Sequence, residues 1–225
     1  MTIKLLPRYI FSDNEAGEVI QATEIGDDIL LQHYIGYREG TVVGVDNVVE
    51  FYSFSTVAAP SVSVEKGQKA WYEVTFLEGT DMSYSQIGWA NCNFKESDDY
   101  LDEGVGDDTS SWSFDGQRVC KCFNGNITSW GKEVEVTGNH VLGVAADLET
   151  GKILFGIDGD WGEPMGVAFD SLEESSLYPA LTGENIVIDV NFGEKAMKFS
   201  PPDETFKQLV ATSSKFYEFI AHNYH

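Results

Sequence analysis

The chain has 225 residues, 42% of them hydrophobic and 13% aromatic, which is enough apolar material for a packed core and excludes intrinsic disorder. Its 37 acidic residues outnumber 14 Lys and Arg and give a formal net charge of −23. That charge excludes nucleic acid and anionic membrane as partners, because phosphate binding needs a basic surface. A protein or peptide partner is expected instead, and a basic one suits the charge best.

The sequence contains no signal for export or for membrane insertion. No apolar run reaches the length of about 18 residues that a membrane-spanning helix needs. Met1–Ile10 is interrupted by Pro7 and lacks the apolar core and cleavage site of a signal peptide. Cys92, Cys120 and Cys122 are too few, and odd in number, for a disulfide framework. We therefore expect a cytoplasmic protein, with the nucleus as the alternative.

Residues 41–200 are expected to form one β-rich domain, because strand patterns and turn residues alternate at short intervals. In Trp71–Phe76 apolar and polar residues alternate with the period of two that is typical of a half-buried strand. The same pattern predicts strands at Tyr84–Ala90, Ser111–Phe114, Gln117–Phe123, Val141–Leu148, Lys152–Ile157 and Ile186–Phe192. No helical pattern alternates with these strands, so a parallel sheet with crossover helices is excluded. The fold class is all-β, with antiparallel sheets packed in two layers.

The two ends of the chain differ from this middle part. Residues 1–40 are expected to be a partly ordered lead-in segment that adds one or two edge strands. Apolar residues recur at intervals of three and four after residue 203, which predicts an amphipathic helix over 203–224. Two interpretations of that helix stay open. It either docks on the sandwich or packs on a neighbouring domain of a longer protein.

A series of short motifs occurs in one order along the chain. These are Ala70–Val74, Gln86–Ala90, Gly104–Gly116, Asn124-Gly125, Trp130-Gly131, Val141–Leu148, Phe155, Asp158-Gly159, Gly166–Phe169, Leu177–Ala180 and Val190–Gly193. The succession resembles the SPRY domain family over about residues 47–199. The motif QIGWA followed by GVGDD and SFDG is most similar to SPRY domains of ryanodine receptors and of very large ubiquitin-ligase proteins.

The resemblance implies a bent sandwich of two antiparallel sheets, a concanavalin-like jelly roll, that has no catalytic activity and binds other proteins through loops. Two departures from the family pattern matter. Asp158 stands where the family often has Asn, and both residues suit that turn. Residues 91–103 are longer and more acidic than in many relatives, so the identity of the partner does not carry over.

The same motifs also have purely structural interpretations. Glycines in strands permit a close backbone approach, which we expect of Gly88, Gly104, Gly106 and Gly116. Short acidic side chains in turns accept backbone N–H groups, which we expect of Asp107, Asp108 and Asp115. Large aromatics supply the core, with Trp71, Trp89, Phe114, Phe155 and Phe192 as candidates.

If every connection reverses the strand direction, the loops fall alternately at the two ends of the sandwich. Counting from Trp71–Phe76 then places the two longest loops, 91–110 and 124–139, at one end with Asp158–Gly162 and Gly183. Aromatic and charged side chains together are typical of protein-binding surfaces. The predicted partner-binding residues are Tyr100, Asp102, Glu103, Asn126, Trp130, Asp158, Asp160, Trp161 and Gly183. In the alternative interpretation Trp130 and Trp161 only cap the sandwich.

No catalytic residue, metal site or cofactor is predicted. The four histidines lack metal-type spacing, and phosphate-loop and nucleophile-elbow motifs are absent. The expected function is a non-catalytic protein–protein interaction module that recruits a substrate, for example for ubiquitin transfer, or serves as a scaffold. The alternative is a lectin-like domain that binds carbohydrate or calcium, with oxygens from Asp98, Asp102, Asp107 and Asp108 as potential ligands.

Overall fold

The computed structural model describes residues 8–13, 19–25, 32–36, 41–43, 47–94, 104–135 and 138–212, and most of these residues lie in strands. The strands before residue 66 are β1 (Arg8–Asp13), β2 (Val19–Ile25), β3 (Gln32–Gly36), β4 (Thr41–Val43), β5 (Val48–Phe51), β6 (Ser55–Ala58) and β7 (Val64–Glu65). The later strands are β8 (Lys69–Ala90), β9 (Ser111–Asp115), β10 (Cys120–Phe123), β11 (Asn126–Ser129), β12 (Val141–Asp147), β13 (Lys152–Ile157), β14 (Gly166–Phe169), β15 (Ser176–Asn191) and β16 (Lys207–Gln208). Among the described residues, no helix is long and apolar enough to cross a membrane.

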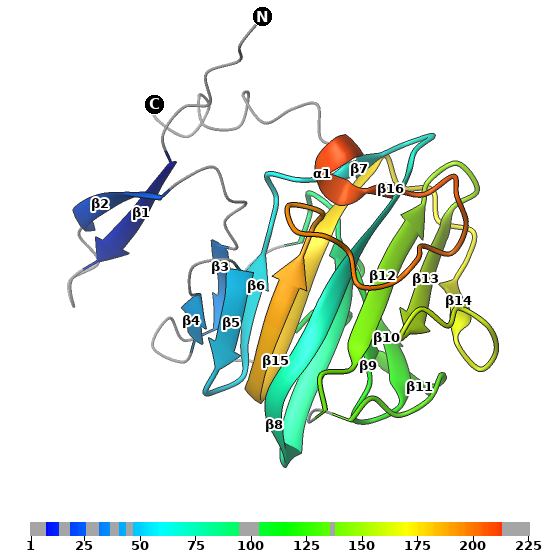
Figure 1. The fold of residues 1–225 in the computed structure, drawn as a ribbon, viewed down its shortest axis with the longest axis horizontal. Coiled ribbons are helices and arrows are strands. Elements are labelled where there is room, and N and C mark those ends of the chain that lie inside the picture. The colour runs from blue at the N-terminus through cyan, green and yellow to red at the C-terminus, as the bar shows by residue number, and fades with distance from the viewer. Residues whose placement is uncertain are drawn as a thin grey trace, which may run out of the picture.

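Two long strands, β8 and β15, run antiparallel side by side through the centre of the molecule (Figure 1). From β8 the sheet continues in one direction through β9, β10 and β11 and in the other through β12, β13 and β14. Strands β5, β6 and β7 pair with β15, while β3 pairs with β6 and β4 with β5. Strands β1 and β2 pair with each other. The predicted all-β architecture of antiparallel strands is confirmed.

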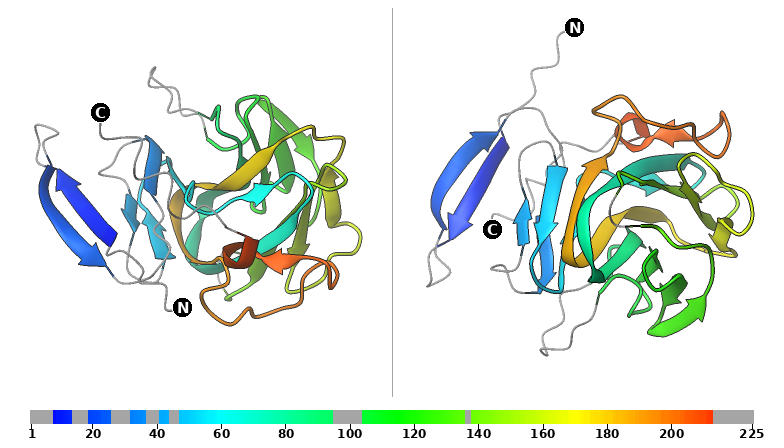
Figure 2. Two further views of the ribbon diagram at one scale, coloured as in Figure 1. Left: turned by 90° about the horizontal axis from the view of Figure 1, so that it is seen from above. Right: turned by 60° about the horizontal axis from the view of Figure 1, so that its bottom comes forward.

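The two layers of the sandwich belong to one continuous, curled sheet, because β8 bends from one layer into the other (Figure 2). The sequence predicted separate strands at Trp71–Phe76 and Tyr84–Ala90, whereas the structure has one strand of 22 residues. The two halves of β8 nevertheless face each other. The Tyr72 hydroxyl donates a hydrogen bond of 2.6 Å to the Gly88 carbonyl, and the Tyr72 and Trp89 ring centroids are 5.1 Å apart.

The core lies between the two curled halves of the sheet. Four of the predicted aromatic core residues, Trp89, Phe114, Phe155 and Phe192, are fully buried in it. The fifth, Trp71, is also buried, but it belongs to a separate cluster with Ala145 and Phe206 on the outside of one layer. Aromatic side chains therefore stabilise both faces of that layer.

The close approach of β8 to β9 depends on a glycine. A Cβ atom at Gly88 would lie 1.9 Å from the carbonyl oxygen of Trp112 on the paired strand. No flexible side chain could move to relieve that contact, because the obstructing atom belongs to the backbone. The structural interpretation of Gly88 as a residue that forms the fold is confirmed.

The predicted C-terminal helix over 203–224 is not supported. The chain forms β16, which pairs in parallel with β8 beyond the point where β15 ends, and then a single helical turn, α1 (Leu209–Thr212). Phe206 and Leu209, which contributed to the helical periodicity, are both buried, Phe206 just before β16 and Leu209 at the start of α1. Residues 213–224 lie outside the described part of the chain.

At the turn between β12 and β13, the carboxylate of Asp147 makes the stability of the fold depend on pH. The Asp147 carboxylate accepts hydrogen bonds from the backbone N–H groups of Glu149 and Thr150 at 3.0 and 2.9 Å, and Lys69 Nζ lies 3.2 Å away. Burial alone would raise the pKa of Asp147, but the hydrogen bonds from Thr150 and Lys69 outweigh burial and hold it below its ordinary value. Asp147 therefore contributes stability above about pH 4 that is lost as the pH falls through its folded-state pKa.

We expect Asp147→Asn to lower the free energy of unfolding at pH 7 by about 1 kcal/mol and to make that free energy fall less steeply below about pH 4. Urea unfolding at a series of pH values measures both effects. Asp160→Asn, at an exposed turn, is the matched control and should follow the wild-type curve. An Asp147→Asn curve parallel to wild type in acid would contradict the assignment.

Candidate functional site

The described members of the predicted partner-binding set do not lie together at one end of the sandwich. Tyr100, Asp102 and Glu103 lie outside the described residues. The other six lie in four places: Asn126 at the start of β11, Trp130 after that strand, Asp158, Asp160 and Trp161 in the segment after β13, and Gly183 within β15. The prediction that one end of the sandwich carries all of these loops is therefore wrong.

The error comes from one strand that the sequence did not reveal. Strand β11 follows β10 after a tight turn and adds a reversal that the count of connections omitted. Residues 130–134 consequently lie beside 116–119, since Trp130 N–H donates to Val119 O at 3.1 Å and Val134 N–H to Gly116 O at 3.0 Å. Similarly, Asn91 Nδ2 donates to Glu174 at 3.0 Å, which places the start of the 91–110 loop beside 170–175.

Trp161 packs on the outer face of the layer formed by β12, β13 and the first half of β8. Its indole covers Gly143 and Gly156, where a Cβ atom would come within 2.6 Å of the ring, and it meets Trp71 edge-on at 6.4 Å. Its Nε1–H donates a hydrogen bond of 3.0 Å to the carbonyl of Ser200. Trp161 thus joins the segment after β15 to the sheet.

The remaining predicted residues lie elsewhere and make other contacts. Trp130 packs edge-on against Phe114 and Phe155, at 5.5 and 6.1 Å, and is half-buried. Asp158 accepts a hydrogen bond from Val141 N–H at 2.9 Å and therefore holds the start of β12. Gly183 is buried in the middle of β15 rather than in a loop. Asn126 is exposed at the start of β11, and Asp160 is exposed at the end of the turn that follows β13.

A different surface has the composition of a recognition site. We call it the outer shelf; it lies over the second half of β8 and consists of Phe54, Tyr84, Asp107 and Arg118, with the buried Gln86 beneath Asp107. Phe54 meets the Tyr84 ring edge-on at 6.5 Å, and the Arg118 guanidinium lies 5.3 Å from the centroid of the same ring. Tyr84 is 37% exposed and the Arg118 side chain 32% exposed, so both are accessible.

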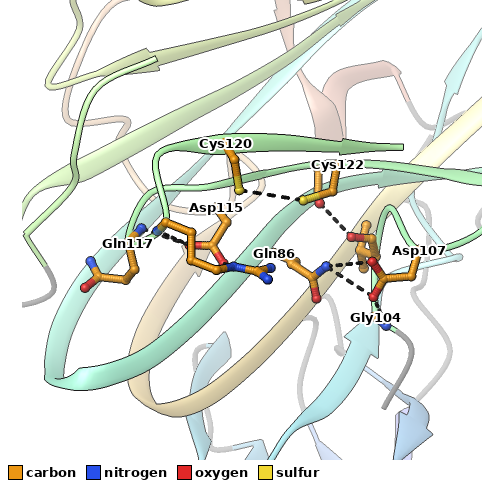
Figure 3. Close-up of polar contacts among 10 residues, drawn as sticks. Gln86, Gly104, Asp107, Asp115, Gln117, Cys120 and Cys122 are labelled. Atoms are coloured by element: carbon orange, nitrogen blue, oxygen red, sulfur yellow. Dashed lines mark hydrogen bonds and ion pairs between the residues drawn. The ribbon is translucent and has the colours of Figure 1, made fainter. Parts of the chain in front are cut away.

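The outer shelf is bounded by the segment 104–111, which folds back onto the sheet (Figure 3). Gln86 Nε2 donates to both oxygens of Asp107, at 3.1 and 3.2 Å, and Gly104 N–H donates to Asp107 at 2.7 Å. Val105 N–H donates to Thr182 Oγ1 at 2.9 Å, next to Gly183. Gly104 and Val105 follow the predicted binding residues Tyr100, Asp102 and Glu103 in the chain. They therefore lie next to Gly183, another predicted binding residue.

Arg118 is held in place by a carboxylate that is itself fully buried. Asp115 accepts hydrogen bonds from Gln117 N–H at 2.9 Å and Arg118 N–H at 3.0 Å, and its second oxygen binds Arg118 Nε at 2.7 Å. Burial alone would lower the pKa of Arg118, but the charge of Asp115 and its hydrogen bond raise it. In the described part of the chain Arg118 pairs with Asp115 through Nε alone, so its terminal nitrogens remain available to a partner.

Two cysteines lie beneath the same segment. Cys120 and Cys122 point to one face of β10 and their Sγ atoms are 3.9 Å apart, with Gly106 directly above Cys122. The hydrogen bond to Cys122 and burial raise the pKa of Cys120, so this thiol stays protonated at neutral pH. Cys120 is buried and packs against Cys122 beneath this segment.

The structure gives the calcium alternative no support in the part of the chain that it describes. Of the four acidic residues considered, Asp107 and Asp108 are described, and both already accept hydrogen bonds from protein donors. Together with Asp115 they accept backbone N–H groups in turns, as the sequence predicted. Within the described ranges no group of three or more His, Cys, Asp or Glu residues could hold a metal ion.

A curled antiparallel sheet that presents an aromatic and charged surface defines a scaffold for binding other proteins. Comparison with known proteins places it in a family: the model described as "SPRY domain" matches residues 69–195, more than half of the chain, so the chain belongs to the SPRY domain family. SPRY domains are generally non-catalytic modules that mediate protein–protein interactions.

The relatives are larger proteins. The chain is 34% identical over 159 residues to the human heterogeneous nuclear ribonucleoprotein U-like protein 2, a match that covers 66% of this chain and 20% of the relative. It is 31% identical over 183 residues to the E3 ubiquitin-protein ligase RKP of Arabidopsis thaliana, covering 75% of this chain and 12% of that protein. The chain therefore spans a fifth or less of these relatives.

The fold itself is similar to that in the crystal structure of the SPRY domain of human HERC1. The TM-score is 0.54 at 14% sequence identity, and the similarity covers 69% of this chain and 94% of that domain. At this identity the likeness shows the fold alone. It confirms the curled sandwich that the family resemblance implied.

Proposed function

We propose that this domain binds a polypeptide segment of a partner protein across the outer shelf and holds that partner within a larger assembly. The observation that carries the proposal is the contact between Tyr84 and Arg118. Tyrosine and arginine are the residues most enriched at binding hot spots, and here they are accessible and pre-positioned by Phe54 and Asp115. A planar guanidinium with free N–H groups suits a carbonyl or carboxylate of the bound segment.

Recruitment of a substrate for ubiquitin transfer is the specific role that we propose for such an assembly. The similarity to an E3 ubiquitin-protein ligase over 75% of this chain supports it. The net charge of −23 favours partners with basic regions around the bound segment. Association should then slow as the salt concentration rises, because screening weakens long-range attraction.

The test compares binding of peptides selected from a random library on the wild-type domain with binding to a double variant, Tyr84→Ala with Arg118→Lys. Lysine keeps the positive charge beside buried Asp115 but loses the planar fork. We expect each substitution to weaken binding about tenfold while the thermal midpoint changes little. Fluorescence anisotropy measures the affinity.

The matched control is Phe199→Ala with Lys207→Ala, an exposed aromatic and an exposed cation on the segment after β15. This control should bind the selected peptides as the wild type does. If the shelf variant bound the selected peptides as tightly as the wild type and the control bound them more weakly, the binding site would not be the outer shelf.

A further inference from the structure

A groove lies between β10 and β14, on the face of β10 opposite the outer shelf. Its volume is about 540 Å³, and β10 and β14 form its two sides. Alternation along β10 places Lys121 and Phe123 in the groove, whereas Cys120 and Cys122 point to the outer face. The groove is therefore separate from the outer shelf.

The floor of the groove is aromatic and continuous with the core. Trp112 and Phe123 are stacked with ring centroids 5.4 Å apart, and Phe169 of β14 meets Phe123 at 6.5 Å. Val167, on the same strand as Phe169, leaves 44% of its surface exposed at the groove. Exposed apolar side chains beside partly buried aromatic rings provide a surface on which an apolar side chain of a ligand can be buried.

The edge of β14 that faces the groove carries backbone groups without a strand partner. In the described part of the sheet β14 is the last strand after β13. The carbonyl oxygen of Ala168 accepts a hydrogen bond from Lys121 Nζ, a side chain that reaches across from β10. Because Lys121 reaches the Ala168 carbonyl from across the groove, this carbonyl points into the groove. A strand added along β14 would donate a backbone hydrogen bond to it.

The rim supplies the charge. Three acidic residues line the groove at the end of β14, namely Asp170, Glu173 and Glu174, and Lys121 is the single basic residue among the lining residues. Glu174 already accepts a hydrogen bond from Asn91, whereas Asp170 and Glu173 are exposed to solvent. The charge of Lys121 is directed at the Ala168 carbonyl and the Phe169 ring. The rim thus favours a cationic ligand.

We infer that this groove is a second binding site, which takes an extended basic peptide as an added strand along β14. Backbone hydrogen bonds to β14 hold the segment. An apolar side chain of the peptide packs on Phe123 and Phe169, and its lysine or arginine side chains bind Asp170 and Glu173. The site makes the domain able to engage a basic peptide while the outer shelf engages its own partner.

The test uses fluorescence anisotropy with a labelled peptide that alternates lysine with valine over about seven residues, and a counterpart in which glutamate replaces lysine. The lysine peptide should bind and the glutamate peptide should not. Asp170→Lys with Glu173→Lys should weaken binding about tenfold. Glu133→Lys with Glu135→Lys, which makes the same change in charge at exposed positions outside the groove, should have a much smaller effect.

Two further arms separate this site from the outer shelf and from general electrostatics. The Tyr84→Ala and Arg118→Lys variant should bind the lysine peptide normally, whereas Val167→Asn, which removes an apolar contact without changing the charge, should weaken it. The inference would be overturned by equal effects of the two charge-reversal pairs, by loss of binding in the shelf variant, or by no binding up to about 1 mM peptide. The proposed function is tested with peptides selected from a library, and the groove is tested with the lysine peptide. Failure of one site can therefore be distinguished from failure of the other.

Discussion

Replacing Asp115 with alanine is expected to lower the free energy of unfolding by about 3 kcal/mol. The carboxylate is fully buried and accepts two backbone N–H groups and the Arg118 guanidinium, so its removal leaves all three without their partner. Arg118 would also lose its fixed position over Tyr84, and affinity for shelf peptides should fall with stability. Urea unfolding and peptide anisotropy on the same variant measure the two effects.

Asp170→Ala is the matched control, because it removes a carboxylate that is exposed and whose nearest hydrogen-bond contact is a 3.5 Å approach from the Ser171 hydroxyl. Its free energy of unfolding should stay within about 0.5 kcal/mol of wild type. If Asp115→Ala behaved like this control, Asp115 could not be the residue that positions Arg118.

The second large effect concerns Trp161. We expect Trp161→Ala to lower the free energy of unfolding by about 2–3 kcal/mol, since it removes an indole that fills the space over Gly143 and Gly156 and contacts Trp71. The hydrogen bond from the indole to Ser200 is lost as well. Thermal or urea unfolding measures the loss.

Trp161→Phe separates the two contributions, because it keeps an aromatic ring but not the N–H group, and we expect it to lose about 1 kcal/mol. An unchanged stability of Trp161→Ala together with weaker peptide binding would return Trp161 to the role of an exposed recognition residue, which the sequence suggested.

The sequence by itself determined the fold class, the central strands of the sheet and the family. Alternation of apolar and polar residues is a local pattern, and it identified the two halves of β8 and strands β9, β12 and β13, of which β9 and β12 are buried along their whole length. Turn-forming Asp and Gly residues and the ordered SPRY motifs were equally visible. The same local chemistry predicted the hydrogen bonds that Asp107, Asp108 and Asp115 accept in turns.

The tertiary structure alone decided which residues meet. All four residues of β11 are exposed, so no burial pattern marks this strand in the sequence, and its extra reversal separated the predicted loops. The helical periodicity after residue 203 was overridden because Lys207 and Gln208 pair with β8, and Phe206 and Leu209 are buried on either side of that short strand. Tyr84 and Arg118 are distant in the chain and come together because the register pairs Gln86 with Asp115. A long loop and not a tight turn joins β8 to β9, so no turn residues in the sequence reveal their register.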